Sequence, residues 1–245
     1  FLNNADAEDS IDITEYFTDN GSGELDLTGM SIGFYGDVDF FKFTPTITTT
    51  ANFTVDHTHS SGNFGQAVAL SAKLTNTKAT IIMPSNAPFV KKEAVKGYGA
   101  TVIECEPTLE AREKTANDFV YKTGASFLHP YNCYDVIAGN STATIELLNQ
   151  YEKLNSIIAP IGGGGLISGT ALAASYFSNV KVYGAEPKGA DDAYRSFKNG
   201  EIIPMINPNT IADGLRTSLG DKGFKIIMKH VTDIFTCEEH EIIHA

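Results

Sequence analysis

Short apolar runs alternate with segments of helical spacing from residue 66 onward, and this alternation restricts the possible folds more than any other property of the sequence. Strands are expected at residues 79–83, 101–105, 126–129, 156–161, 181–185 and 234–237. Helices are expected at residues 66–74, 87–98, 109–122, 166–176, 191–198 and 223–230, with one or two within 133–153 and another beginning at 238. This spacing predicts an α/β fold of doubly wound, mostly parallel sheets with helices on both faces.

Residues 1–57 do not follow the alternation. They hold eleven acidic residues and a single base, Lys42, whereas the rest of the chain is close to neutral. Residues 44–55 are rich in Thr and β-branched side chains, which favour extended backbone. We therefore expect three parts: an acidic, extended or β-like segment at 1–57, a small α/β domain at 58–131 and a large α/β domain at 132–245.

The composition argues against several classes of partner. A net charge of −12 disfavours binding to nucleic acid or to anionic membranes. No apolar run is long enough to cross a bilayer, and no signal peptide is recognisable. Cys105, Cys133 and Cys237 are far apart and form no CxxC motif, so neither a zinc site nor a disulfide framework is indicated. These features predict a cytoplasmic protein with reduced thiols.

Four consecutive glycines at 162–165 stand where a strand should pass into a helix. A helix N-terminus offers unpaired N–H groups and a partial positive charge, and glycines let an anion approach the backbone closely. Three interpretations stay open: a cup for one phosphate monoester, a plain tight turn, and an imperfect dinucleotide fingerprint. The last would use Gly163, Gly165 and Ser168, with Glu186 about 20 residues further on for a ribose.

A second glycine-bearing loop precedes the helix at 66–74 and contains Ser60, Ser61, Gly62 and Asn63. Taken alone, it can also be a turn that ends in an Asn helix cap. Ligands of open α/β sheets bind beyond the carboxyl ends of the strands, and both loops fall at that edge. Together the two loops predict two anionic groups held face to face.

Several motifs in register carry a resemblance to a known family. They include Ser-Ser-Gly-Asn at 60–63, Gly-Ala-Glu-Pro at 184–187, Ala-Asp-Asp at 190–192 and Ile-Ala-Asp-Gly at 211–214. From about Thr58 to Ala245 the chain resembles the serine racemase and threonine dehydratase family of fold-type-II enzymes, which use pyridoxal 5′-phosphate (PLP). The resemblance implies two α/β lobes, a large lobe that is incomplete at its C-terminal end in this chain, and a homodimer.

The resemblance also implies which residues hold the cofactor and the substrate. Backbone N–H groups would bind the cofactor phosphate at Gly162, Gly163, Gly164, Gly165 and Leu166. Asn63 would bind the cofactor's ring hydroxyl, and Ser61 would move a proton at the substrate Cα. Three residues would hold the substrate or close the site over it, namely Ser60, Arg112 and Thr217.

A divalent-cation site is implied as well. Glu186, the carbonyl of Ala190 and Asp192 resemble the cation ligands of serine racemases, and hard oxygen ligands suit Mg²⁺ or Ca²⁺. The alternative is that the two carboxylates are surface charges near a helix start. The sequence leaves both alternatives open.

The chain departs from the family in its lysine motif. The family carries its cofactor-binding lysine in a Ser-Phe-Lys-x-Arg-Gly stretch upstream of the serine loop, and that stretch does not occur here. Lys42 is the only lysine before Lys73, so it is the provisional catalytic lysine; an ordinary strand lysine is the alternative. Phe64 stands where the family usually has His, which removes a polar substrate contact.

The sequence thus predicts a PLP-dependent racemase or dehydratase that acts on serine or threonine. PLP makes the Cα proton of an amino acid acidic, and loss of the β-hydroxyl from the same carbanion gives a 2-oxo acid and ammonia. A second hypothesis is a catalytically inactive relative that binds a ligand or serves as a partner subunit. A dinucleotide-binding protein is the third.

Overall fold

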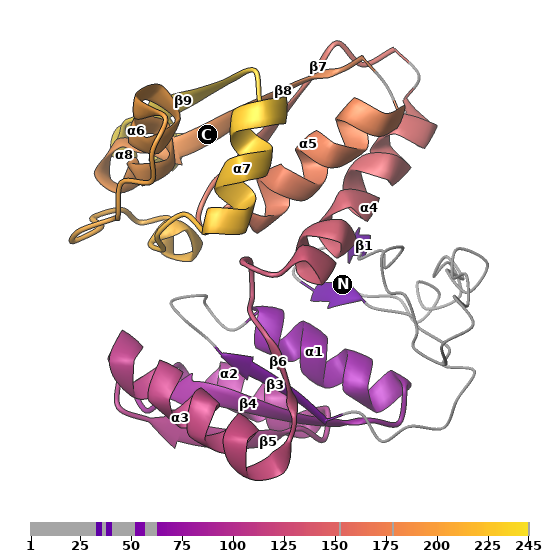
Figure 1. Cartoon of the computed structure of the whole chain (residues 1–245), viewed down its shortest axis with the longest axis vertical. Coiled ribbons are helices and arrows are strands. Elements are labelled where there is room, and N and C mark those ends of the chain that lie inside the picture. The colour runs from indigo at the N-terminus through magenta and orange to yellow at the C-terminus, as the bar shows by residue number, and fades with distance from the viewer. Residues whose placement is uncertain are drawn as a thin grey trace.

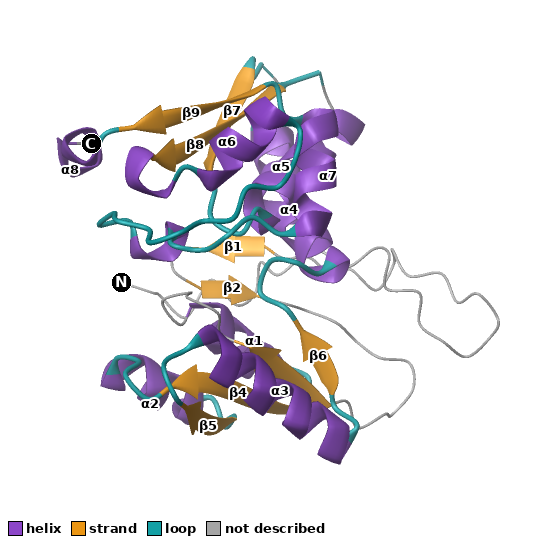
Figure 2. Cartoon of the chain, turned by 60° about the vertical axis from the view of Figure 1, so that its left-hand side comes forward, coloured by secondary structure: helices purple, strands orange, loops and turns teal. Residues whose placement is uncertain are grey.

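The computed structural model describes residues 33–35, 38–40, 52–56, 63–151, 153–177 and 179–244. Figure 1 shows two lobes, each built on its own parallel sheet, and Figure 2 separates their helices and strands by colour. The α/β class with parallel sheets is therefore confirmed. A short antiparallel pair, β1 (Gly33–Tyr35) and β2 (Val38–Phe40), contacts a helix of each lobe.

The small lobe holds a four-stranded parallel sheet in the order β5-β4-β3-β6. Its strands are β3 (Asn52–Asp56), β4 (Lys78–Pro84), β5 (Thr101–Cys105) and β6 (Ser126–Leu128). Its helices are α1 (Asn63–Leu74), α2 (Phe89–Gly97) and α3 (Leu109–Thr123). Helices α1 and α2 pack together on one face, and α3 lies on the other (Figure 1), as a doubly wound sheet requires.

Strand β3 lies within the segment 1–57 that was expected to stand apart from the lobes. It pairs with both β4 and β6, so it is an inner strand of the small sheet, and the sheet begins before residue 58. The chain winds outward from β3 through β4 to β5 and then crosses back to β6 on the other side of β3. This reversal makes the carboxyl ends of β3 and β6 the topological switch point, where such sheets bind ligands.

The large lobe holds a three-stranded parallel sheet in the order β7-β8-β9. Its strands are β7 (Ser156–Pro160), β8 (Lys181–Pro187) and β9 (Asp233–Cys237). Its helices are α4 (Tyr134–Gln150), α5 (Gly165–Phe177), α6 (Asp192–Asn199), α7 (Asp221–His230) and α8 (Glu239–His244), with 3-10 turns at Lys188–Ala190 and Asp213–Leu215.

Each lobe has its own apolar core. The small lobe buries residues of α1, β4 and α2, among them Val68, Ile81 and Val95. The large lobe buries Ile161, Ile167 and residues from β8, α7 and β9. None of the helices in the described ranges is both long enough and apolar enough to cross a membrane.

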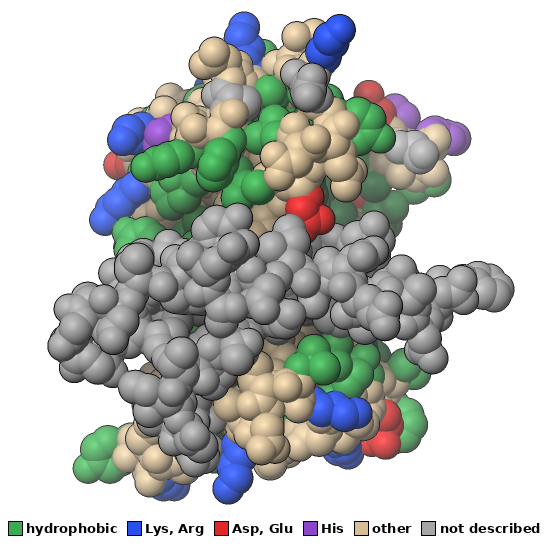
Figure 3. Space-filling view, turned by 90° about the vertical axis from the view of Figure 1, so that its right-hand side faces the viewer, with side chains coloured by type: hydrophobic (Ala, Val, Ile, Leu, Met, Phe, Trp, Pro, Cys, Tyr) green, Lys and Arg blue, Asp and Glu red, His purple; other side chains and the backbone are tan. Residues whose placement is uncertain are grey.

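Apolar side chains are exposed on both lobes on the face shown in Figure 3. The most exposed large apolar residues of the described chain include Tyr121 on α3 and Tyr176 near the end of α5, at 91% and 87%. Apolar residues that are exposed singly are normal on protein surfaces, so we assign these no role.

Candidate functional site

The glycine loop lies at the carboxyl end of β7, where it leads directly into α5. Ile161 still belongs to the sheet edge, since its N–H donates to the carbonyl of Ala185 at 3.0 Å. Among the hydrogen bonds between described residues, none is donated by the backbone N–H groups of residues 162–167; the first such donor in the helix is Ser168, to Gly164 at 3.1 Å. Six consecutive amides at the positive end of α5 therefore have no acceptor among the described residues, and such groups can donate to an anion.

The other side of the loop is closely packed, and each wall excludes a Cβ. A Cβ on Gly163 would lie 2.1 Å from Cγ of Tyr131, and one on Gly162 would lie 3.0 Å from the carbonyl of Gly214. Gly164 has φ +90°, and its Cβ would lie 2.6 Å from Cδ1 of Leu219. Side chains at this loop would therefore collide with its walls, which explains why four glycines stand in a row.

Thr217 supplies the second observation at this loop. It is only 5% exposed, and its Oγ1 lies 3.1 Å from the place where a Cβ on Gly162 would be. This hydroxyl is buried and has no hydrogen-bond partner among the described residues. A buried polar atom without a partner costs free energy, and native proteins usually satisfy such atoms with a ligand or water. A phosphorylated ligand at the loop would fit both this hydroxyl and the amides that lack an acceptor among the described residues.

The small-lobe half of the predicted site is only partly described. Ser60, Ser61 and Lys42 lie outside the described residues. Helix α1 begins at Asn63, immediately beyond the serine loop, which follows the carboxyl end of β3 at the switch point. The two described ends that flank the serine residues, the end of β3 and the start of α1, therefore lie at the ligand-binding edge of the small sheet, and the approach of Ser60 and Ser61 to that edge stays a prediction.

Two further residues of the small lobe are buried in packing. Phe64 is 7% exposed and belongs to the same apolar core cluster as Val68 and Val136. Arg112 is 4% exposed in the first turn of α3, and its Nε donates to the carbonyl of Thr108 at 3.2 Å. The substrate contact expected of Arg112 remains a prediction.

Tyr131 was not expected at the site. It follows β6 at the switch point, and its ring covers Gly163 as described above. Its ring also meets His129 edge to face, with the centroids 4.5 Å apart. The only sequence signal for this residue is its place just after a strand at the ligand-binding edge.

The predicted cation ligands lie together, deeply buried, behind the glycine loop. Glu186, near the end of β8, is 1% exposed and accepts hydrogen bonds from the N–H groups of Ala193 (3.3 Å) and Tyr194 (2.7 Å) at the start of α6. Asp192 accepts one from Leu219 at 2.7 Å, but its Oδ1 has no partner among the described residues. Ala190 is fully buried. Surface charge is therefore the wrong interpretation of these carboxylates.

Burial makes both carboxylates weak acids. Desolvation, with a contribution from the charge of Asp192, raises the pKa of Glu186 to about 8, and desolvation raises the pKa of Asp192 to about 6. Within the described residues no group of three or more His, Cys, Asp or Glu side chains is arranged to hold a metal ion. A cation here would have two carboxylates and backbone or water oxygens as ligands.

We expect the metal-free protein to lose stability as the pH rises from about 5 to 8.5, and Glu186→Gln to remove part of that loss. The unfolded chain releases the Glu186 proton near pH 4.5, whereas the folded chain holds it until about pH 8, so rising pH favours unfolding. Thermal unfolding in EDTA gives the difference in melting temperature, variant minus parent. This difference should be more positive at pH 8.5 than at pH 5.5. Glu201→Gln, at an exposed position, is the control; an equal offset at both pH values contradicts the prediction.

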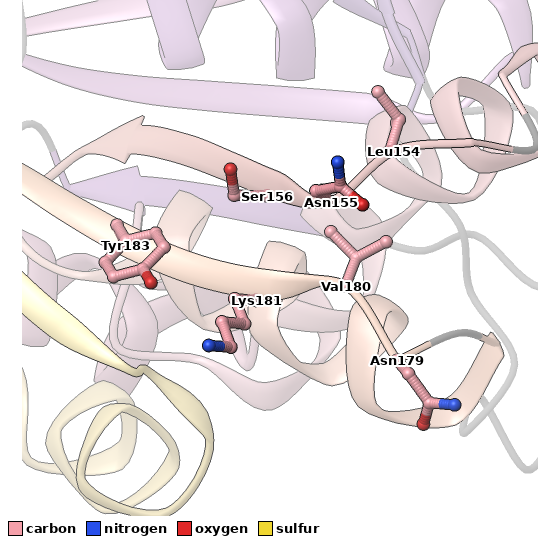
Figure 4. A pocket seen from close by; sticks show the side chains of 7 residues that line it. All are labelled: Leu154, Asn155, Ser156, Asn179, Val180, Lys181 and Tyr183. Atoms are coloured by element: carbon pink, nitrogen blue, oxygen red, sulfur yellow. The ribbon is translucent and has the colours of Figure 1, made fainter.

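A hollow of about 680 Å³ lies elsewhere, at the amino ends of β7 and β8 (Figure 4). Its lining includes Asn155, Ser156, Lys181 and Tyr183. The glycine loop follows the opposite, carboxyl end of β7, so this hollow is not part of the site.

Comparison with known proteins gives consistent matches over the two lobes. The family model for pyridoxal-phosphate dependent enzymes matches residues 55–245. The serine racemase of Dictyostelium discoideum is 46% identical over 191 residues, which are 77% of this chain and 59% of that protein. The beta-hydroxyaspartate dehydratase of Paracoccus denitrificans (strain Pd 1222) is 44% identical over 189 residues, 77% of this chain and 60% of its own.

Solved structures agree with the sequence matches. The crystal structure of the Dictyostelium serine racemase superposes with a TM-score of 0.73 and 44% identity, covering 80% of this chain and 62% of that one. The structure of the maize serine racemase superposes with a TM-score of 0.75 and 42% identity, covering 81% of this chain and 59% of that one. The chain thus spans about three fifths of the length of the relatives it matches. Its two parallel sheets, its glycine loop and these matches place the chain in the fold-type-II family of pyridoxal-phosphate dependent enzymes.

Proposed function

We propose that this chain binds PLP and acts as a racemase or dehydratase on serine or threonine. The observation that carries the proposal is that the amides of residues 162–167 and the nearby hydroxyl of Thr217 have no hydrogen-bond partner within the described part of the chain. The relatives support the reaction class, because they include serine racemases, a beta-hydroxyaspartate dehydratase and a threonine deaminase. Bound PLP would supply an electron sink that makes the Cα proton of an amino acid acidic.

The residues of the chain would then do the following. The N–H groups of Gly162 to Leu166 bind the phosphate, with the positive end of α5 behind them, and Thr217 donates a hydrogen bond to the ligand. Asn63 binds the ring hydroxyl, and Ser61 moves a proton at the substrate Cα. Ser60 and Arg112 hold the substrate carboxylate. Leu219, the buried wall of the loop, would help to keep water away from the phosphate side of the site.

We also propose a divalent cation, Mg²⁺ or Ca²⁺, at Glu186, the carbonyl of Ala190 and Asp192. Oδ1 of Asp192, which has no partner in the described ranges, and the raised pKa values of both carboxylates support it, because a cation would satisfy the oxygen and relieve the cost of burying two negative groups. Asp192 also fixes Leu219, a wall of the glycine loop, so the cation would stiffen the phosphate site from behind.

A second candidate function is a ligand-binding relative without catalysis. The observation in its favour is that Lys42 is the only lysine before Lys73 and does not lie in the family's lysine motif. Such a protein would bind a phosphate through residues 162–167 but would not turn over an amino acid.

One experiment separates these candidates. The purified chain is incubated with PLP and freed of excess cofactor, and its absorption spectrum is compared with that of the cofactor-free protein. The sample is then reduced with borohydride, and any labelled lysine is located by mass spectrometry. We expect retained PLP with Lys42 labelled, and D-serine or pyruvate from L-serine; Lys42→Ala should abolish the label. Retained PLP without label or turnover supports the second candidate. A chain that retains no PLP contradicts the first candidate, and the second is then tested by stabilisation of the chain with inorganic phosphate or L-serine in a thermal melt.

A further inference from the structure

The turn at 129–132 joins the two lobes, running from β6 to α4 (Figure 1). Within this turn, Nδ1 of His129 accepts the N–H groups of Tyr131 (3.4 Å) and Asn132 (3.0 Å). A ring nitrogen that accepts hydrogen bonds carries no proton, and burial lowers the pKa of His129 to about 4, so the imidazole is neutral at physiological pH. The turn is thus fixed from within before it meets the large lobe.

Asn132 fastens this turn to the amino end of α7. Its Nδ2 donates to Oδ1 of Asp221 at 2.7 Å, and its Oδ1 accepts the backbone N–H of Lys222 at 3.0 Å. Its main-chain carbonyl accepts Nζ of Lys222 at 3.1 Å. A Cβ on Gly220 would lie 2.7 Å from Oδ1 of Asn132, so the close approach depends on that glycine. Three hydrogen bonds therefore join positions about 90 residues apart in sequence.

The same end of α7 also holds the glycine loop. The N–H of Gly220 donates to the carbonyl of Gly163 at 3.1 Å. Gly163 is thus fixed on two sides, by Gly220 at its carbonyl and by the Tyr131 ring at its Cα. Asn132 neighbours Tyr131 in sequence and contacts the residues that follow Gly220, so it links both restraints.

We infer that Asn132 is a positioning residue that holds Tyr131 and the amino end of α7 against Gly163, and so keeps the loop amides directed at a phosphate before the ligand arrives. The identity of the ligand, the phosphate of PLP, rests on the proposed function. This arrangement, in which Asn132 holds Tyr131 and the amino end of α7 against Gly163, is called the clamp below. It is a property of the chain without ligand. Preorganised donors bind more tightly because the ordering cost has already been met.

A charge and amide exchange tests the clamp. In Asn132→Asp the new carboxylate faces Asp221 and the bond between them is lost, while the acceptor for Lys222 remains. Adding Asp221→Asn returns an amide donor to the pair with the roles reversed. The double variant should therefore recover the order of the glycine loop and the ligand affinity that the single variant loses. A general loss of packing would not be reversed by the second substitution.

The first readout needs no ligand. Because the chain contains no Trp, Tyr131→Trp places a single reporter at the glycine loop. In the full chain, Asn132→Asp should raise the acrylamide quenching of this reporter about twofold or more, and the double variant should return it to the parent value. A reporter at Tyr176→Trp, already exposed near the end of α5, should not respond. Unchanged quenching at position 131 overturns the inference.

The second readout is PLP affinity in chains that keep Tyr131. Asn132→Asp should weaken PLP binding about tenfold, and Asp221→Asn in the same chain should restore most of it. A lower melting temperature with unchanged PLP affinity would show a purely structural role and would also overturn the inference. If the parent binds no PLP, the proposed function fails, and the quenching cycle decides the clamp by itself: recovery in the double variant supports it and no change refutes it.

Discussion

Gly169→Ala should lower the free energy of unfolding by about 2–4 kcal/mol, one of the largest losses expected for adding a single methyl group to this chain. A Cβ at Gly169, on α5, would lie 2.5 Å from the carbonyl oxygen of Ile137, 2.7 Å from the amide nitrogen of Ser141 and 2.8 Å from the carbonyl carbon of Asn140. All three atoms belong to the backbone of α4, so no side chain can rotate away. The two helices would have to separate along their contact.

Chemical denaturation of the parent and the variant measures this loss. Gly97→Ala is the matched control, because Gly97 is the last residue of α2 and, apart from its chain neighbours and the backbone of its own helix, no described atom lies within 4 Å of the place that its Cβ would take. Alanine there should be neutral or stabilise by up to about 1 kcal/mol through helix propensity. Equal effects at the two positions would show that helix contact at Gly169 is not the cause.

Thr217→Val should shift stability and ligand binding in opposite directions. Valine has nearly the shape of threonine but removes the buried hydroxyl that has no partner among the described residues. The ligand-free chain should gain about 1 kcal/mol, because an unsatisfied buried group disappears. Binding of PLP or inorganic phosphate should weaken about tenfold, because the same hydroxyl is the expected donor to the ligand. Thermal unfolding and equilibrium titration give the two quantities.

Thr142→Val is the control for this substitution. Thr142 is also buried, but its hydroxyl donates to the carbonyl of Gly139 at 2.9 Å, so valine should destabilise the chain and leave ligand binding unchanged. If Thr217→Val also destabilises the ligand-free chain and spares binding, Thr217 is a structural residue and its assignment to the site is wrong.

Local sequence signals predicted most elements within a residue or two. The strand expected at 101–105 is β5, and the helix expected at 109–122 is α3, which begins after the Thr108 cap and ends before Gly124 at φ 68°. Such elements are set by apolar spacing, caps and glycines that lie within the segment itself. The region 133–153, left open between one helix and two, forms the single helix α4, because its buried Gly139 packs within the helix instead of ending it.

Features that depend on contacts between distant segments were not predictable from the sequence. Strand β3 lies in an acidic segment, and only its pairing with β4 and β6 makes it an inner strand. The ring of Tyr131 over Gly163 and the grip of Asn132 on α7 join residues that no periodicity relates. The place of the glycine loop between a strand and a helix was predictable from the four consecutive glycines, but its ligand was not, because a phosphate cup, a tight turn and a dinucleotide site share that pattern.

The position of the loop walls has a consequence for how this protein could change its role. Tyr131, the four glycines, Thr217 and Leu219 all lie between residues 131 and 219, whereas the only upstream lysine, Lys42, lies far outside that stretch. Under the proposed function, the residues that would bind the phosphate and the lysine that would react are therefore encoded in separate stretches of the gene. A descendant that lost the lysine but kept the glycine loop and its walls could then act as a receptor that binds PLP without reacting with it.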